Sequence, residues 1–317
     1  WRAGGCRRSG ERRCSAARCA RGSYLTHDGT APNAAKDLDT FANLAGDPNS
    51  PPRPHLGASQ IGNSCERALW YSYHHCKLPA FSGRMLRLFE TGKREEERII
   101  RELRQAGVYV RDLGNDGNQI RFEMFGGKFA GSLDGIVLGI PEAPKTPHLL
   151  EIKTANDKSF KQMLKNGVEH SKHQHYCQMQ VYMGAFNLTR ALYIVVNKND
   201  DSIYSERIEF HKPTYDLLIN KAERIVTSDA PLERCESFEC KWCEFKKICN
   251  WEEMPHICCR TCAHWGKCET DEVCEKHIWN PHLIHSEAVD ASEEAGWILY
   301  ADGRRNGPGY LKSEEMG

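Results

Sequence analysis

The chain has 317 residues, with 43 Lys and Arg against 43 Asp and Glu, so its formal net charge is zero. Such a length allows one globular domain with an appendage, or two small domains. The balanced charge excludes a uniformly basic nucleic-acid coat, although a neutral total can hide a local positive groove. Because no run of about 18 uncharged apolar residues occurs, we expect a soluble protein without a membrane-spanning helix.

Three segments of the chain differ in composition. Residues 1–55 are expected to be mostly disordered, because they are rich in Arg at first and then in Pro, Asn, Asp and Ala. A basic DNA-binding arm at residues 1–22 is the alternative. Residues 56–250 carry the periodic patterns of a folded domain. Residues 251–317 are expected to form a small cysteine-rich metal module.

Residues 56–228 alternate between helix and strand signals. Apolar residues at helical spacing predict a short helix capped by Ser59. Further helices are expected at 84–105, around 160–165, at 173–187 and at 213–228. Strands are expected in a hairpin of 120–124 with 129–140, over 149–153, and in a hairpin of 191–196 with 203–210. This order predicts an α/β fold in which a small mixed sheet is flanked by helices.

Two acidic residues and a lysine stand out in the predicted strands. Asp134 lies in GSLDG, and Glu151 and Lys153 follow in LLEIKT. Residues two apart in a strand share a face, so Glu151 and Lys153 are expected to point to where Asp134 can meet them. Paired carboxylates bind Mg²⁺ or Mn²⁺, and an adjacent ammonium orients a water or a phosphate. A surface ion pair is the alternative, which the apolar neighbours Leu150 and Ile152 make less natural.

These segments resemble a known nuclease signature. GSLDG followed by LLEIKT is similar to the PD-(D/E)XK motif, with Leu133 where Pro is often found. Upstream, Gly92 and Glu96 resemble the helical G-x-x-x-E motif of RecB-type and phage exonucleases. Downstream, Gln178 and Tyr182 resemble the Q-x-x-x-Y motif of the same branch, and their spacing places both on one helical face. The four motifs in this order predict a restriction-endonuclease-like core.

The resemblance implies a role for each matching residue. The metal ligands that it implies are Asp134, Glu151, the carbonyl of Ile152, and Glu96 as a further or water-bridged ligand. One or two metal ions are compatible with this set. Lys153 would position the attacking water. Gln178 and Tyr182 would support the site or contact the DNA backbone, unless they belong to a packed amphipathic helix.

Nine of the 15 cysteines lie between residues 235 and 274. Without a secretory signal, such CxxC pairs hold metal more often than disulfides. One upstream cysteine and a downstream C-x2-C-x5-C group resemble the iron-sulfur staple of AddB-type and CRISPR-adaptation nucleases. The residues concerned are Cys65, Cys240, Cys243 and Cys249. The resemblance implies a 4Fe-4S cluster that clamps distant segments together, although Zn²⁺ would accept the same ligands.

A second cysteine group follows directly. The residues with a knuckle spacing typical of structural Zn²⁺ are Cys259, Cys262, Cys274 and His277. Cys268 is an alternative member of this group. The cysteines without ligand spacing, which are expected to be small buried residues, are Cys76, Cys177 and Cys235.

The motifs together predict a Mg²⁺- or Mn²⁺-dependent DNA exonuclease or end-processing nuclease. The branch that the chain resembles implies recombination or repair, acting on DNA ends or single strands in the cytoplasm of a bacterium or a phage-infected host. Since no G-x-x-x-x-G-K-[ST] motif occurs, a helicase or a single-strand annealing partner would act in trans. The alternative is a non-catalytic DNA- or protein-binding factor on a nuclease fold, which the intact Asp134, Glu151 and Lys153 disfavour.

Overall fold

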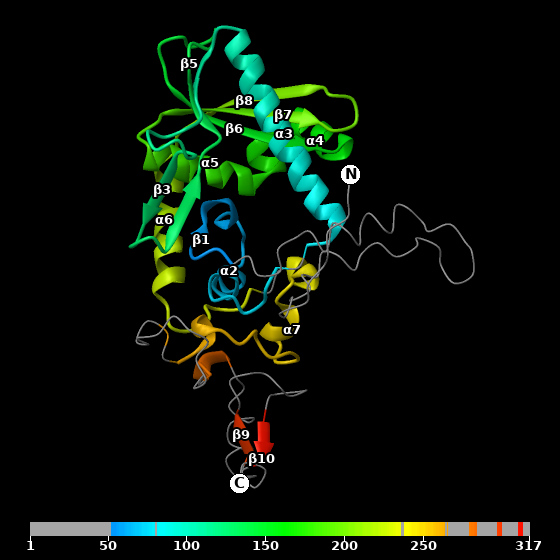
Figure 1. Cartoon of the computed structure of the whole chain (residues 1–317), viewed down its shortest axis with the longest axis vertical. Coiled ribbons are helices and arrows are strands. Elements are labelled where there is room, and N and C mark those ends of the chain that lie inside the picture. Colours follow the sequence, from blue (N-terminus) through cyan, green and yellow to red (C-terminus); the bar gives the residue numbers. More distant parts are fainter. Residues whose placement is uncertain are drawn as a thin grey trace, which may run out of the picture. The chain divides into compact units, whose positions relative to one another are not determined.

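A five-stranded mixed sheet, the largest in the described chain, lies in the upper part of Figure 1. The computed structural model describes residues 52–79, 81–235, 238–263, 265 and 279–283, and the backbone of 297–299 and 310–312. The expected disorder of residues 1–55 therefore falls almost entirely outside the described residues. Contacts divide the chain into two units, and of the smaller one (1–48 and 81–86) only 81–86 are described, at the start of helix α3 (Gly83–Gln105).

The strands of this sheet come from widely separated parts of the chain. Their order is β2 (Tyr109–Arg111), β5 (Gly135–Leu138), β6 (His148–Ala155), β7 (Arg190–Asn197) and β8 (Ile203–Glu209). Strands β6 and β7 are parallel, and the other neighbours are antiparallel. The central strands are buried along most of their length, whereas β8 at the edge alternates between exposed and covered residues. The predicted small mixed sheet flanked by helices is confirmed.

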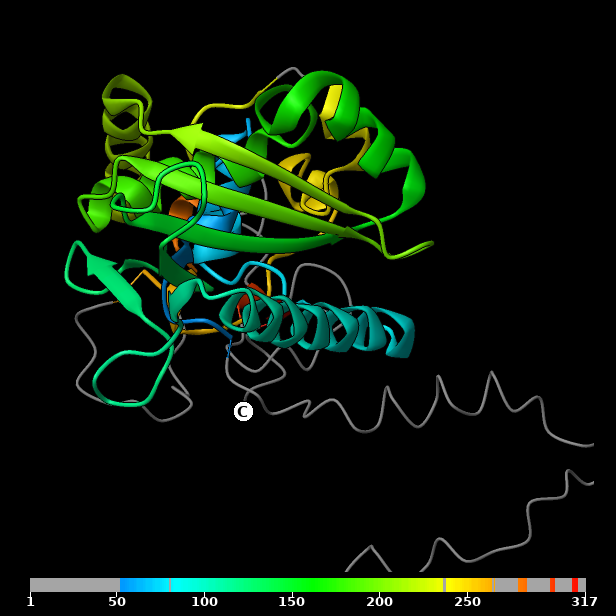
Figure 2. The ribbon, with the colours of Figure 1, turned by 90° about the horizontal axis from the view of Figure 1, so that it is seen from above.

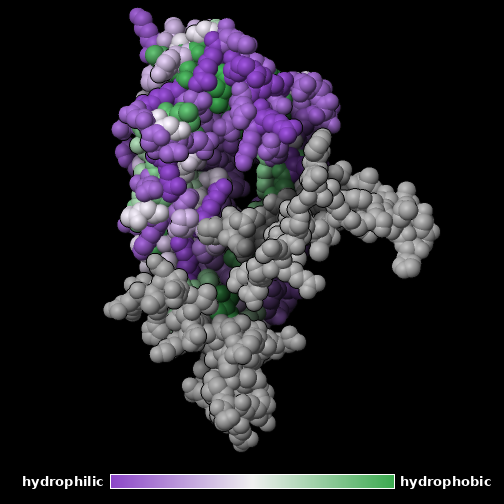
Figure 3. Space-filling model, viewed as in Figure 1, coloured by the Kyte–Doolittle hydropathy of each residue, from purple (hydrophilic) through white to green (hydrophobic). Residues whose placement is uncertain are grey.

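Helices cover both faces of the sheet (Figure 2). On one face, Ile99 of α3 packs with Ile152 in an apolar cluster. On the other face, α4 (Asp157–Ser171) and α5 (His173–Ala185) contribute to a larger core that includes Met179. The surface seen over α3 is mostly hydrophilic (Figure 3). The amphipathic pattern of α3 and α4 follows from covering the sheet with one side, whereas α5 is buried on all sides over residues 176–183.

Helix α4 continues beyond its predicted end. The chain breaks helical geometry at Gly167, whose φ is 71°, and then resumes the helix as far as Ser171. The backbone N–H of Val168, freed by this break, donates to Oε2 of Glu206 at 2.8 Å. Glycine suits the position because a positive φ is strained for residues with a Cβ.

The predicted strand over 129–140 is wrong as a single element. Its first half, β4 (Phe129–Ser132), belongs to a separate sheet with β3 (Arg121–Met124) and β1 (Leu56–Gly57), while its second half is β5 of the central sheet. Leu133 is buried, and its N–H continues the β3–β4 ladder to the carbonyl of Ile120 at 2.9 Å. The chain passes from one sheet to the other directly after this residue.

The predicted Ser59 cap is also wrong. Helix α2 (Glu66–Tyr73) begins after Cys65, whose Sγ accepts a hydrogen bond from the N–H of Ala68 at 3.4 Å. Ser59 lies in the preceding 3-10 turn η2 (Ala58–Gln60). Helix α6 (Lys212–Thr227) agrees with its prediction and has a proline in its first turn.

In the cysteine-rich part of the chain, the elements that the structure describes are short. They are η3 (Phe238–Trp242), α7 (Lys246–Cys249), η4 (Cys259–Thr261), η5 (Pro281–Leu283) and the antiparallel pair β9 (Trp297–Leu299) and β10 (Tyr310–Lys312). In the part of the chain that the structure describes, none of the helices combines the length and apolarity that crossing a bilayer requires.

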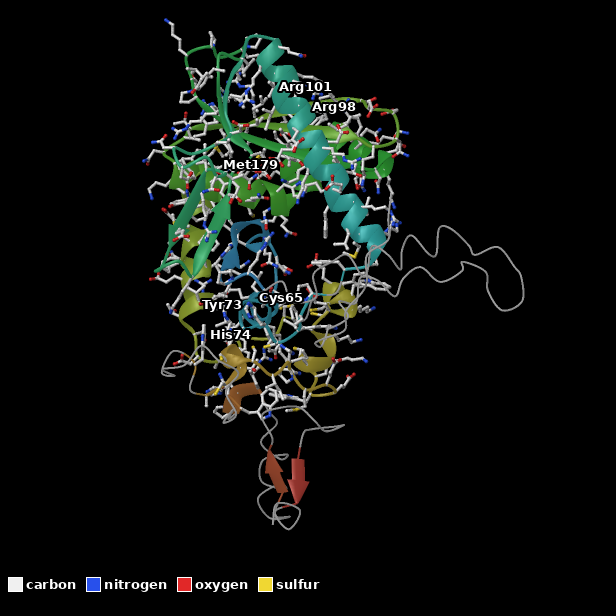
Figure 4. The ribbon with its side chains drawn as sticks, in the orientation of Figure 1. Cys65, Tyr73, His74, Arg98, Arg101 and Met179 are labelled. Atoms are coloured by element: carbon white, nitrogen blue, oxygen red, sulfur yellow. The ribbon has the colours of Figure 1, made fainter. Side chains whose placement is uncertain are left out.

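One arginine joins this segment to the beginning of the described chain. The guanidinium of Arg260 donates hydrogen bonds to the carbonyls of Tyr73 and Pro54, each at 2.5 Å, and lies 4.7 Å from the centre of the Tyr73 ring. Tyr73, at the end of α2, lies below the sheet in Figure 4. Arg260 thus bonds to two backbone positions about 200 residues earlier in the sequence.

Replacement of Gly62 by Ala is expected to lower the free energy of unfolding by about 1–3 kcal/mol. A Cβ at this position would stand 2.6 Å from the Cα of Gln174, so the loop would have to move away from α5. Urea denaturation measures the effect. Gly92→Ala in α3 is the matched control, because its Cβ would meet nothing within 4 Å and alanine favours a helix by up to about 1 kcal/mol. Equal destabilisation by both substitutions would contradict this account.

Candidate active site and cysteine site

Asp134, Glu151 and Lys153 lie together where β5 and β6 separate. In the β5–β6 register Gly135 pairs with Leu150, so Asp134 and Glu151 stand at the next position along. Oδ2 of Asp134 accepts a hydrogen bond from the N–H of Ile152 at 2.7 Å, which replaces the ladder bond that β5 no longer provides. The structure therefore brings the three predicted residues together through the backbone of β6.

Lys153 neutralises this cluster from within. Its Nζ contacts Oε1 of Glu151 and lies 3.9 Å from Oδ2 of Asp134. Burial alone would lower the pKa of Lys153, but the two carboxylates more than offset this effect and hold the pKa above its ordinary value. The two carboxylates thus favour the ammonium form of Lys153 in this arrangement.

The carboxyl group of Glu151 is fully buried, with 0% of the residue exposed. Burial raises the pKa of Glu151 above its ordinary range, even though the ammonium of Lys153 opposes the shift. Its Oε2 atom is buried without a hydrogen-bond partner among the described residues. A buried carboxylate oxygen without a partner is costly unless a cation or a proton satisfies it.

Glu96 reaches the same site from helix α3. Burial and the nearby Asp134 raise the pKa of Glu96 to about 7. Its Oε1 accepts a weak hydrogen bond from Nε2 of Gln119 at 3.4 Å. The helical motif, about 40 residues before the strand motifs, therefore lies within electrostatic reach of Asp134 and Lys153.

The carbonyl of Ile152 faces the same gap between the strands. The N–H and C=O of one strand residue point to the same side, and the N–H of Ile152 points to Asp134. The side chain of Ile152 packs on the opposite face, under α3. This geometry is compatible with the ligand role that the nuclease resemblance implies for the carbonyl.

The oxygen donors of this site fit Mg²⁺ or Mn²⁺ in kind. Carboxylates and a backbone carbonyl are the hard ligands that these ions prefer, and the unsatisfied Oε2 of Glu151 supplies a reason for a cation to bind. As they stand, however, no three His, Cys, Asp or Glu side chains in the described ranges are arranged to hold an ion. The contact between Lys153 and Glu151 occupies one of the oxygens that a metal would use.

Gln178 and Tyr182 form part of the wall beside this site. Both are buried on α5, and Nε2 of Gln178 donates to the hydroxyl of Tyr182 at 3.2 Å. Burial, followed by the charge of Glu151, raises the pKa of Tyr182. A Cβ on Gly131 would stand 2.7 Å from the Tyr182 hydroxyl, so this glycine permits the close approach. The burial of the pair favours support of the site over contact with DNA.

Two residues near the site were not identified from the sequence. Tyr193 is opposite Glu151 in the β6–β7 register, is fully buried, and its hydroxyl lies 2.7 Å from Nδ1 of His175. Burial and the ammonium of Lys153 lower the pKa of His175 to about 3, so that its imidazole is neutral. His175 precedes Gln178 by three positions and therefore shares its helical face, which is the signal that could have identified it.

The two segments that carry the predicted staple approach each other, but no three His, Cys, Asp or Glu side chains within the described ranges are placed to hold an ion, so the four-cysteine site stays a prediction. Burial raises the pKa of Cys243, a backbone hydrogen bond opposes the shift, and the nearby Cys65, Cys240 and Cys249 raise it further. Cys65 thus influences the pKa of Cys243 electrostatically, together with Cys240 and Cys249, from a position at least 175 residues earlier in the sequence. A hydrogen bond of 2.6 Å from Oγ of Ser64 to Glu239 joins the two segments.

The other cysteines differ in their surroundings. Cys76 and Cys177 are buried, as predicted. Cys235 is only partly buried and lies 3.1 Å from the sulfur of Cys240, so its prediction as an isolated buried residue is wrong. The tight η3 turn, which the spacing of the cysteines does not reveal, brings it there.

The predicted zinc knuckle is only partly described. Cys259 is exposed at the start of η4, Cys262 is buried directly after that turn, and Cys274 and His277 lie outside the described residues. The separate zinc module thus stays a prediction.

No protein-family model matches the chain, and no curated protein matches it. Among solved structures it is similar to the alkaline exonuclease LHK-Exo from Laribacter hongkongensis, at 16% identity and a TM-score of 0.41 over 59% of this chain and 90% of that one. The complex of LHK-Exo with dAMP has the same identity and score over 60% and 90% of the two chains. SSO0001 is similar at 15% identity and a TM-score of 0.42 over 70% and 99%. These likenesses are distant, and the functional proposal below depends on the acidic site itself.

We expect Mn²⁺ to bind more tightly as the pH rises from about 6 to about 8, because ligands must lose their protons before they coordinate. The raised pKa values of Glu96 and Glu151 place this change near neutrality rather than near pH 4. Glu151→Gln should weaken binding at least about tenfold, as measured by calorimetry. The control is Glu123→Gln on the exposed part of β3. Affinity independent of pH in this range would contradict the site.

Proposed function

We propose that the chain is a metal-dependent deoxyribonuclease of the PD-(D/E)XK superfamily. The observation that carries the proposal is the cluster of the buried Glu151 with the partly buried Asp134 and Lys153, at the point where two strands separate. Glu96 joins it from a helix, in agreement with the motif order of RecB-type and phage exonucleases. A surface ion pair would not have a fully buried carboxylate, so the burial of Glu151 disfavours that interpretation. The presence of all three residues, Asp134, Glu151 and Lys153, disfavours the non-catalytic alternative.

The proposed ligands of Mg²⁺ or Mn²⁺ are Asp134, Glu151, the carbonyl of Ile152, and Glu96. When bound, the ion would supply charge neutralisation at the phosphate and a water of lowered pKa. The protonated Lys153 would orient the attacking oxygen or hold the phosphate; it has no free electron pair with which to act as a base. Gln178 and Tyr182 would hold this face of the site rigid.

DNA ends or single strands are the proposed substrates, and an exonuclease or end-processing role in bacterial or phage recombination or repair is the proposed setting. This part of the proposal depends on the order of the sequence motifs. The cytoplasm is the corresponding compartment, and a helicase or an annealing protein would supply strand separation in trans.

Asp134→Ala should lower DNA hydrolysis by more than about 100-fold, because it removes both a ligand and the hydrogen bond to Ile152. End-labelled linear DNA and closed circular DNA, each with Mg²⁺ or Mn²⁺, form the assay. Degradation of the linear form alone indicates an exonuclease. The control is Asp229→Ala, which removes an exposed carboxylate after α6. Wild-type rates in Asp134→Ala would exclude the assigned site.

We propose further that Cys65, Cys240, Cys243 and Cys249 hold a 4Fe-4S cluster, with Zn²⁺ as the alternative ion. The proximity of Cys65 to the three downstream thiols supports a shared ligand set. Thiolates are the ligands that both groups require. Such a centre would join α2 to the segment after α6.

Anaerobically purified protein is expected to be brown, with broad absorption at about 400 nm from the cluster. Cys65→Ser should remove the colour, although this residue is far from the other ligands in sequence. Cys177→Ser, which replaces a buried thiol on α5, should retain the colour. Colourless protein that contains one zinc per chain, lost in Cys65→Ser, would assign Zn²⁺ instead.

A further inference from the structure

A fifth thiol lies against the four-cysteine site. The sulfurs of Cys235 and Cys240 are 3.1 Å apart and are not joined by a disulfide. Sγ of Cys240 also donates to the carbonyl of Cys235 at 3.0 Å. Cys240 is thus a proposed metal ligand and also contacts Cys235.

The segment that carries Cys235 is held in place from both sides. The guanidinium of the preceding Arg234 donates to the carbonyl of Cys249. Beyond it, Glu239 accepts the hydrogen bond from Ser64. These contacts tie Arg234 to α7 and Glu239 to the start of α2, on either side of Cys235 in the sequence.

The sulfur separation differs from that of two ligands on one centre. Sulfurs bound to one tetrahedral Zn²⁺ at about 2.3 Å stand about 3.8 Å apart, and cysteines on a 4Fe-4S cluster bind different irons at larger separations. The observed 3.1 Å is shorter than either. To reach the bond length of a disulfide the two sulfurs need to approach by only about 1 Å.

We propose that Cys235 and Cys240 are a redox-active dithiol whose oxidation to a disulfide removes Cys240 from the four-cysteine metal site. The two thiols together lose two protons and two electrons. A two-electron oxidant such as hydrogen peroxide accepts them and becomes two molecules of water, while the bond between the sulfurs forms. Both cysteines are partly exposed, which admits an oxidant of this size.

The disulfide and the metal site exclude one another. A sulfur in a disulfide has no thiolate left to donate to a metal ion. The loss of a metal ligand on oxidation therefore rests on the proposed four-cysteine site. The formation of the disulfide does not depend on that site. Cys235 would make the centre sensitive to oxidation without being one of its ligands.

The full chain is purified under reducing conditions, treated with hydrogen peroxide, alkylated and mapped by mass spectrometry. A Cys235–Cys240 linkage is expected as the main disulfide. Metal release is followed in parallel with a chromogenic chelator. Cys235→Ser should retain the metal content of the wild type and release it at least fivefold more slowly under peroxide. Cys177→Ser, whose thiol lies on α5, should behave as the wild type.

Several results would overturn the proposal. A different partner for Cys240, or no disulfide in the treated wild type, excludes the dithiol. Loss of metal from reduced Cys235→Ser makes Cys235 a ligand, and equal release rates in wild type and variant remove its role in oxidation. If the reduced wild-type protein contains no metal, the four-cysteine site and the loss of its ligand on oxidation are both refuted. The disulfide between Cys235 and Cys240 is then decided by mass spectrometry alone. Nuclease activity is measured separately and decides the acidic site alone.

Discussion

The hydrogen bond from the N–H of Ile152 to Asp134 is the interaction on which the acidic site depends. It forms just beyond the last residue pair of β5 and β6. There the carboxylate of Asp134 accepts the hydrogen bond that the N–H of Ile152 would otherwise donate to the neighbouring strand. The same event turns the N–H and carbonyl of Ile152 toward the gap and places Glu151 beside Asp134. The acidic site therefore forms at the position where the chain passes from the β1–β4–β3 sheet to the five-stranded sheet.

Burial gives this feature its chemistry. Glu151 is removed from water in a strand whose other face packs under α3, so its charge must be met by Lys153, by a proton or by a cation. Lys153 alone does not satisfy both oxygens of Glu151, because Oε2 of Glu151 has no hydrogen-bond partner within the described chain. Tyr182 and Gln178, which are buried and bonded to each other, pack on α5 beside this group.

Most of the fold was predictable because its signals are local. The period of α3, the apolar run of β6 and the two strands of the β7–β8 hairpin were all identified from neighbouring residues. The errors occurred where a distant segment decided the outcome. Residues 129–140 looked like one strand, but Leu133 belongs to one sheet and Gly135 to another. Likewise, the cap of α2 is set at Cys65 after a loop that packs on α5.

The sequence by itself determined which chemical groups are present and their order: the acid, the acid-x-lysine triplet, and a cysteine set split between Cys65 and the downstream group. Only the tertiary structure decided which of them meet, because contacts across 100 residues or more depend on sheet register and packing rather than on local preference. Tyr193 and Cys235 illustrate this limit. Neither has a recognisable spacing, and each reaches its site only because a neighbouring strand or turn places it there.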